Sequence, residues 1–192
     1  FVVGDSSYVR QYPRFFQSQG PTPPIGTTFT GFLKPTKIAQ GPAVLFVLGL
    51  AVPVQSLLFN AAAVVHRGQI RGYVPKEKLP TYNVFYEGRT FSRGGPGLAL
   101  DAGGVPLGDQ LFAFDFGTIG VEVCEDAWAP DGPMRRRCFS GAEIIVNVSA
   151  SPYRMGIAET RREMLATRAA DNQTVLVYAN AVGAQDGLIY DG

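Results

Sequence analysis

Apolar residues in the middle of the chain form runs whose length is typical of β-strands. Residues 44–50 are continuously apolar, as expected of a strand that is buried on both faces. Leu57 to His66 is a second run, rich in Ala and Val, and Gln69 to Val74 is a third. Arg67-Gly68 supplies a two-residue turn between them, so the second and third runs are predicted to form a hairpin.

A second pair of strands is predicted farther along the chain. Phe occupies every second position from Phe112 to Phe116, and Ile or Val every second position from Ile119 to Val123. Gly117-Thr118 is the predicted turn, with Gly in its first central position. The opposite parity places Glu122 and Cys124 together on the other face of the second strand.

The last third of the chain has the pattern of a crossover unit. Ile144 to Val148 is an apolar strand, and Ala158 to Asn172 is rich in residues that favour helices. Val175 to Val182 is the next predicted strand. A strand, a helix and a strand at this spacing indicate an α/β architecture with parallel pairing.

The start of the chain has no such pattern. Residues 1–40 contain closely spaced Gly, Pro and Thr and show no clear period, so no structure is assigned there. We therefore expect one domain over residues 41–192. A chain of 192 residues has room for one domain with a substantial core and is too short for two of ordinary size.

Composition narrows the class of protein. The net charge is +1, and no basic stripe indicates a nucleic-acid partner. The longest apolar stretch, Pro42 to Leu58, is interrupted by Gly49, Pro53 and Gln55, which argues against a membrane span. No signal peptide is visible, and two cysteines form no disulfide framework, so we expect a cytoplasmic protein. One His and two Cys leave no plausible zinc ligand set.

Two residues are candidates for chemistry, and each has an ordinary structural interpretation. Cys124 ends a core strand and is followed by two acids and the nearby Trp128, which is not a typical position for a filler residue. To act as a nucleophile it must be a thiolate, which a nearby cation would favour. On position alone, a small buried core residue is the commoner role of a free cysteine. Lys76 follows a strand, where lysines are usually solvated. Cys138 follows three arginines in a predicted loop and is interpreted as structural.

Four segments together resemble a known family, the amidase (glutaminase) domain of glutamine-dependent NAD⁺ synthetases, within the carbon–nitrogen hydrolase (nitrilase) superfamily. They occur in the family's order over roughly three quarters of the chain, a conjunction that is far more specific than any one segment. The segments are Lys76-x-x-Leu79-Pro80-x-Tyr82-x-x-Phe85-x-Glu87, Gly120-Val121-Glu122-Val123-Cys124-Glu125-Asp126-Ala127-Trp128, Asn147-Val148-Ser149-Ala150-Ser151-Pro152, and Tyr178-Ala179-Asn180-x-x-Gly183-x-Gln185-Asp186 through Asp191-Gly192.

The resemblance implies a fold, a reaction and roles for five residues. The fold is an αββα sandwich that pairs with a second copy, in a homo-oligomer. Cys124 would attack the side-chain amide of glutamine and form a thioester, and Lys76 would stabilise the oxyanion and favour the thiolate. Tyr82 and Ser151 match positions that hold glutamine, and Glu125 is the candidate for binding its ammonium group.

The resemblance also implies a division of labour with a partner. The ammonia would pass to an ATP-dependent NAD⁺ synthetase domain that acts on deamido-NAD⁺, and no such domain is expected within this chain. No cofactor is expected in the glutaminase domain itself, since ATP and Mg²⁺ would belong to the synthetase domain. The whole protein would be an amidotransferase-type ligase.

Two positions depart from the family pattern. The family's third catalytic residue is a Glu well upstream of the lysine, whereas no Glu occurs here before Glu77. The domain is therefore expected to be truncated at its start, and the chain as it stands to be a poor glutaminase unless Glu87 substitutes. The family also tends to place a Lys or Arg six residues after Ser151, where this chain has Ile157, with Arg154 close by.

Two other interpretations remain open from the sequence. One is an amidase of the same superfamily that acts on a different amide or a nitrile. The other is a catalytically impaired remnant that keeps the sandwich as an assembly module. The Cys-Glu-Asp-x-Trp and Leu-Pro-x-Tyr details favour the glutaminase, and the missing upstream Glu favours the remnant.

Overall fold

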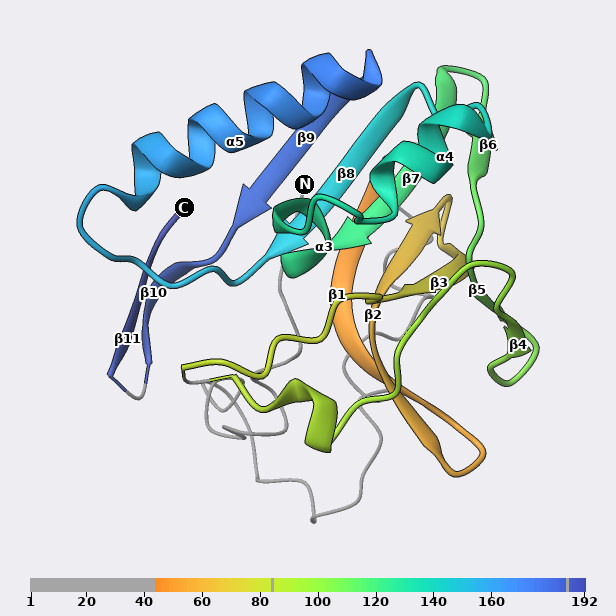
Figure 1. Ribbon diagram of the computed structural model, residues 1–192. Coiled ribbons are helices and arrows are strands. Elements are labelled where there is room, and N and C mark those ends of the chain that lie inside the picture. Colours follow the sequence, from red (N-terminus) through yellow and green to blue (C-terminus); the bar gives the residue numbers. More distant parts are fainter. Residues whose placement is uncertain (1–43, 84, 186) are drawn as a thin grey trace.

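Two β-sheets form the centre of the structure, a computed structural model that describes residues 44–83, 85–185 and 187–192 (Figure 1). The unassigned segment 1–40 and the motif residue Asp186 lie outside the described residues. The first sheet has the strand order β1-β2-β3-β5-β4 and the second β6-β7-β8-β9. A separate two-stranded ribbon, β10-β11, closes the described chain.

The first sheet is built from hairpins. Strands β1 (Leu45–Val54), β2 (Leu57–His66) and β3 (Gln69–Pro75) are antiparallel neighbours. The predicted turn at Arg67-Gly68 is confirmed, with φ of 48° and 72°, the positive values that a two-residue turn of this kind needs. Two short strands, β4 (Ala99–Asp101) and β5 (Pro106–Gly108), extend this sheet beyond β3.

The second sheet contains the crossover unit that the sequence predicts. Strands β7 (Gly117–Val123), β8 (Ile144–Ser149) and β9 (Val175–Asn180) are parallel, and β6 (Phe112–Phe114) pairs antiparallel with β7. Helix α5 (Ile157–Asn172) joins β8 to β9. This confirms the α/β architecture.

The core lies between the two sheets. Alternate residues of the first sheet, among them Val47, Ala62 and Val64, meet those of the second in one buried cluster. The intervening residues of β1 and β2 pack in another cluster on the opposite face of the first sheet. This double burial explains why both strands read as continuous apolar runs.

Helices cover the outer face of the second sheet (Figure 1). Helix α4 (Met134–Phe139) packs there through Met134 against Ile145. The remaining elements are helix α3 (Glu125–Trp128), the 3₁₀ turn η3 (Glu87–Arg89), β10 (Val182–Gln185) and β11 (Leu188–Asp191). Across the described parts of the chain, none of the helices combines the length and the apolar character that a membrane span requires.

The turn predicted at Gly117-Thr118 is wrong by two residues. The chain turns at Asp115-Phe116, and Gly117 pairs with Phe114 inside the sheet. Thr118 is held in the sheet because its N–H donates to the Glu143 carboxylate at 2.8 Å and its carbonyl accepts from the Glu143 N–H at 2.9 Å. A turn centred on Thr118 would break both bonds.

The segment with three arginines is also different from its prediction. It forms helix α4 rather than a loop, and its residue Arg137 is buried, with only 2% of its surface exposed. The guanidinium of Arg137 is paired with Glu77 and Asp109, two acids that are distant in sequence. Local sequence pattern carries no signal of such distant partners, which here allow a charged side chain to be buried.

Candidate active site

Cys124 lies where the chain leaves β7. It has φ of 48° and ψ of −102°, a conformation that is strained for a residue with a Cβ, and only 4% of its surface is exposed. Its N–H donates to the Val148 carbonyl at 2.9 Å, and its carbonyl accepts from Asn147 at 3.3 Å. Both partners belong to β8, so the neighbouring strand holds this strained residue in place.

This backbone conformation changes the predicted side-chain direction. Parity along the strand placed Cys124 with Glu122, but the strand ends at Val123. Cys124 instead packs in the cluster that contains Val121 and Val123, between the two sheets. The parity argument fails because it assumes that the strand continues through Cys124.

Lys76 follows the last residue of β3 and is completely buried. Its Nζ lies 2.8 Å from Oε1 of Glu87 at the start of η3, and the other Glu87 oxygen accepts from Asn60 at 3.4 Å. The Asn60 carbonyl also accepts from the Lys76 N–H at 2.8 Å. Lys78, two residues on, instead lies at the surface and pairs with the exposed Asp131.

Tyr82 and Glu125 contact each other. The Tyr82 hydroxyl donates to Glu125 Oε2 at 2.8 Å, and about half of the Tyr82 surface is exposed. The pKa of Tyr82 is raised, first by partial burial, then by the hydrogen bond and charge of Glu125 and by the charge of Cys124, while Lys76 opposes the shift. The hydrogen bond places Tyr82 beside the residue that follows Cys124.

Ser151 follows β8 and is held by the side chain of Asn180. Its N–H donates to Asn180 Oδ1 at 2.7 Å, and its carbonyl accepts from Asn180 Nδ2 at 3.1 Å. Tyr178, also on β9, has its pKa raised to about 12, first by burial and then by the charge of Cys124, whereas Ser149 and Ser151 lower it. Ser151 and Cys124 therefore lie near one tyrosine.

The second departure from the family pattern has a structural counterpart. Ile157 begins helix α5 and is buried, with 3% of its surface exposed. Arg154, three residues earlier, is exposed. At this position the chain has a core residue rather than a cation.

A row of buried polar side chains lies on β7 and β8 and reaches the backbone carbonyl of Cys124 through Asn147. Asn147 Nδ2 donates to Glu122 Oε1 at 3.0 Å, and Ser149 donates to Asn147 Oδ1 at 2.8 Å. The pKa of Glu122 is raised to about 8, first by complete burial and then by the charge of Asp126, against the opposing effects of Asn147 and Arg137.

Sequence reasoning assigned no role to the residues that support the candidates. Asn60, Asn147 and Glu122 are polar residues inside otherwise apolar strands, and that mismatch is the signal that would have found them. Asn180, a polar residue in the otherwise apolar β9, carries the same signal, whereas Asp126 carries none. Within residues 44–192, apart from 84 and 186, no three His, Cys, Asp or Glu side chains gather as a metal site would need.

Comparison with known proteins identifies the family. The model of the family described as Carbon-nitrogen hydrolase matches residues 30–192. The chain is 41% identical over 135 residues to the glutamine-dependent NAD(+) synthetase of Aquifex aeolicus, covering 70% of this chain and 22% of that protein. It is 38% identical over 135 residues to that of Thermotoga maritima, covering 70% and 21%. The chain thus spans about a fifth of these relatives.

Solved structures give the same result. The glutamine-dependent NAD+ synthetase of Acinetobacter baumannii, in complex with ADP, has a TM-score of 0.70 at 28% identity, covering 82% of this chain and 28% of that one. A mutant of the Nesterenkonia AN1 amidase from the nitrilase superfamily has a TM-score of 0.65 at 20% identity, covering 81% and 53%, which shows a shared fold. The predicted nitrilase-like fold is confirmed, and the chain belongs to the carbon–nitrogen hydrolase family.

Proposed function

We propose that this chain forms the glutaminase site of a glutamine-dependent NAD⁺ synthetase. The site would hydrolyse the side-chain amide of glutamine and supply ammonia for ATP-dependent synthesis of NAD⁺ from deamido-NAD⁺. The observation that carries the proposal is the buried Lys76–Glu87 pair, at 2.8 Å, on a loop whose backbone is hydrogen-bonded through the Asp126 carboxylate to the strand end before the strained Cys124. The glutamine-dependent relatives support the choice of substrate.

The proposed reaction has two halves. The Cys124 thiolate adds to the amide carbon, and the Lys76 ammonium stabilises the negative charge that develops on the amide oxygen. The carbon–nitrogen bond then breaks as the nitrogen takes up a proton and leaves as ammonia. Water attacks the resulting thioester, gives up a proton, and releases glutamate and the free thiol.

Glu87 is the carboxylate that the described residues bring to Lys76. We propose that it orients the lysine and keeps it charged, because a buried ammonium without an anion tends to lose its proton. Its position also makes it the candidate among the described residues for the two proton transfers.

Substrate binding falls to the exposed side of the site. Tyr82 and Glu125 already contact each other, and we propose that the Glu125 carboxylate binds the ammonium group of glutamine while Tyr82 keeps it in place. Ser151 would contact the rest of the substrate. The thioester route uses only side chains of this chain, so no cofactor is proposed here, and ATP and Mg²⁺ would act in a synthetase domain.

That synthetase domain is the proposed partner that accepts the ammonia. As the resemblance implies, we further propose that the protein is a cytoplasmic homo-oligomer. These proposals rest on relatives that are about five times longer than the matched region.

A second candidate function is hydrolysis of a different amide. It is favoured by Ile157, which puts a buried apolar side chain where the family tends to place a cation. A site without that cation would have less reason to prefer a substrate with a carboxylate. Comparison of glutamine with short aliphatic amides decides between the two functions.

The test is release of ammonia and glutamate from glutamine by the purified protein. Cys124→Ala should abolish both products, and the matched variant Cys138→Ala should retain them, because Cys138 packs beside Met134 and Ile145 and not in the cluster that contains Cys124. Trapping with iodoacetamide, followed by peptide mapping, should label Cys124 first. Preferential labelling of Cys138, or activity that survives Cys124→Ala, would count against the proposal.

A further inference from the structure

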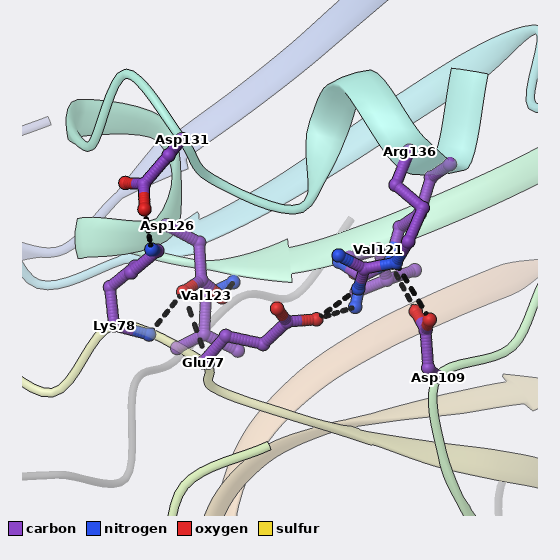
Figure 2. Close-up of polar contacts among 9 residues, drawn as sticks. Glu77, Lys78, Asp109, Val121, Val123, Asp126, Asp131 and Arg136 are labelled. Atoms are coloured by element: carbon purple, nitrogen blue, oxygen red, sulfur yellow. Dashed lines mark hydrogen bonds and ion pairs between the residues drawn. The ribbon is translucent and has the colours of Figure 1, made fainter. Parts of the chain in front are cut away.

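The carboxylate of Asp126 uses both of its oxygens on backbone N–H groups. Oδ1 accepts from the N–H of Glu77 at 3.1 Å and from that of Lys78 at 2.8 Å, while Oδ2 accepts from the N–H of Val123 at 3.1 Å. Asp126 is almost completely buried, with 1% of its surface exposed. Figure 2 shows its carboxylate between these three backbone groups.

The three donors flank the two proposed catalytic residues. Glu77 and Lys78 directly follow Lys76, and Val123 directly precedes Cys124. Lys76 comes from the end of a strand in the first sheet and Cys124 from the end of a strand in the second. One side chain therefore ties together the two strand ends that carry the reaction.

We propose that Asp126 is a positioning residue that sets the placement of Lys76 relative to Cys124. This inference rests on the proposed function, in which Lys76 and Cys124 act in the same reaction. Hydrogen bonds to an ionised carboxylate are about twice as strong as neutral ones. Three of them on one rigid, buried side chain leave the lysine loop little freedom to move away from the nucleophile.

A second contact holds the same loop to helix α4. The side chain of Glu77 accepts from Arg136 at 2.5 Å and from Arg137 at 3.3 Å (Figure 2). Arg137 also donates to the carbonyl of Val121 on β7. The loop is thus attached to the nucleophile strand at two points, of which Asp126 is the one next to Cys124.

The backbone of Asp126 is closely packed on Gly132. A Cβ at position 132 would overlap the Asp126 carbonyl oxygen, so this close approach requires glycine. The nearby Asp131 offers a contrast, since it is 82% exposed and binds only the flexible end of Lys78, at 2.6 Å. Two acids five residues apart thus bind the same lysine loop. Asp126 binds its backbone, and Asp131 binds the side-chain ammonium of Lys78.

Three charged side chains act on Asp126, and they come from α4, from β7 and from the loop after β3. Its pKa is raised to about 6, first by burial, while the Lys78 N–H, the charge of Arg137 on α4, the Val123 N–H and the charge of Lys76 lower it. Glu122 on β7 is the acid that interacts with it. The three N–H bonds favour the ionised carboxylate and oppose the effect of burial.

Substitution of Asp126 by Asn distinguishes a positioning role from a purely electrostatic one, because the two roles shift the pH of Cys124 alkylation in opposite directions. Removal of a negative charge near Cys124 would by itself favour the thiolate, and alkylation would begin at lower pH. Loss of a positioned Lys76 would disfavour the thiolate, and alkylation would begin at higher pH. Positioning and simple electrostatics therefore predict opposite shifts.

The experiment measures iodoacetamide alkylation of Cys124 against pH, together with glutamine hydrolysis. The variants are Asp126→Asn, Asp126→Glu as a second variant that keeps the charge, and Asp131→Asn as the matched control. All are studied on the folded fraction that size-exclusion chromatography isolates. We expect the midpoint of the alkylation profile to rise in Asp126→Asn, and kcat to fall by about 100-fold, as for a misplacement of about 1 Å. KM should change little.

Asp126→Glu should show the same two changes, because the longer side chain cannot satisfy all three N–H groups in the same space. Asp131→Asn should resemble the unchanged protein. A lowered or unchanged midpoint in Asp126→Asn, or a kcat equal to that of Asp131→Asn, would overturn the positioning role. Alkylation needs no glutamine, so a protein that proves inactive toward glutamine refutes the proposed function while the midpoint still decides the role of Asp126.

Discussion

The carboxylate of Glu87 lies 2.8 Å from the ammonium of Lys76, and both groups are buried, with 6% and 0% of their side-chain surface exposed. Both residues lie between strands β3 and β4 of the first sheet, Lys76 directly after β3 and Glu87 at the start of the 3₁₀ turn η3. A charged pair at this depth requires good geometry, since each partner has lost its water. Its removal should therefore affect both stability and catalysis.

Replacement of only one member of this pair should destabilise the fold. Glu87→Gln removes the carboxylate charge that lies 2.8 Å from the buried Lys76 ammonium, at a cost of about 3–5 kcal/mol in the free energy of unfolding. The double variant Lys76→Met with Glu87→Gln removes both charges and should recover most of that loss. Urea denaturation measures both, with Glu163→Gln on the exposed face of α5 as the control. Equal stability of Glu87→Gln and Glu163→Gln would contradict this prediction.

The two lysines of the loop should differ in their effect on catalysis. Lys76→Ala removes the proposed oxyanion partner and should raise the barrier by about 3 kcal/mol, seen as a fall in kcat/KM for glutamine. Lys78→Ala removes a solvent-screened pair with the exposed Asp131 and should leave the barrier unchanged. Steady-state release of ammonia tests both variants. If both substitutions are tolerated equally, Lys76 has been assigned the wrong role.

Stability should depend on pH through Glu122. Its pKa is raised from 4.5 to about 8 in the folded protein, chiefly by burial. The folded state therefore holds a proton that the unfolded state has lost, and stability falls as the pH rises between these two values. Below 4.5 this cost is absent, and above about 8 it is complete.

Glu122→Gln cannot ionise, and it keeps nearly the shape of the protonated acid. It should unfold at the same denaturant concentration as the unchanged protein near the lower of these pH values. Near the upper one it should be more stable by on the order of a few kcal/mol. Urea denaturation across this range tests the prediction, and parallel pH profiles for the two proteins would refute it.

Loss of Asn180 should weaken substrate binding more than the chemical step. Asn180→Ala leaves the buried N–H and carbonyl of Ser151 without the bonds of 2.7 and 3.1 Å that now fix them. A loss of about 1.4 kcal/mol in substrate binding corresponds to a tenfold rise in KM. Saturation curves for glutamine measure it, with Asn172→Ala at the end of α5 as the control. A change in kcat alone would assign Asn180 to the reaction rather than to binding.

Local pattern was sufficient for most strands and for the crossover helix. Runs such as Leu57 to His66 alternate between two buried faces, and the Arg67-Gly68 turn has the residues that its backbone conformation needs. The pattern misplaced the turn before β7, because Thr118 is fixed in the sheet by Glu143, a residue 25 positions away. The glycine therefore indicated the approximate place of the turn but not the residues at its centre.

The candidate site was predictable only in its principal residues. Cys124, Lys76, Tyr82, Glu125 and Ser151 were found from motif order, and their roles stay predictions. The contacts that arrange them join segments 48 or 49 residues apart, as between Asp126 and the loop after Lys76, and no local rule encodes such distances. The burial of Arg137 was hidden for the same reason, since its acidic partners lie on other elements.

At Cys124 the strained backbone lowers the stability of the fold, while the same residue supplies the proposed nucleophile. A residue at φ of 48° and ψ of −102° would be relieved by glycine, typically by about 1–3 kcal/mol. Laboratory evolution that selects only for heat resistance should therefore select Cys124→Gly. The resulting proteins should be more thermostable and should lack the nucleophile. Persistence of cysteine under that selection would mean that packing between the sheets outweighs the strain, whereas its loss would mark Cys124 as a residue that only selection for chemistry retains.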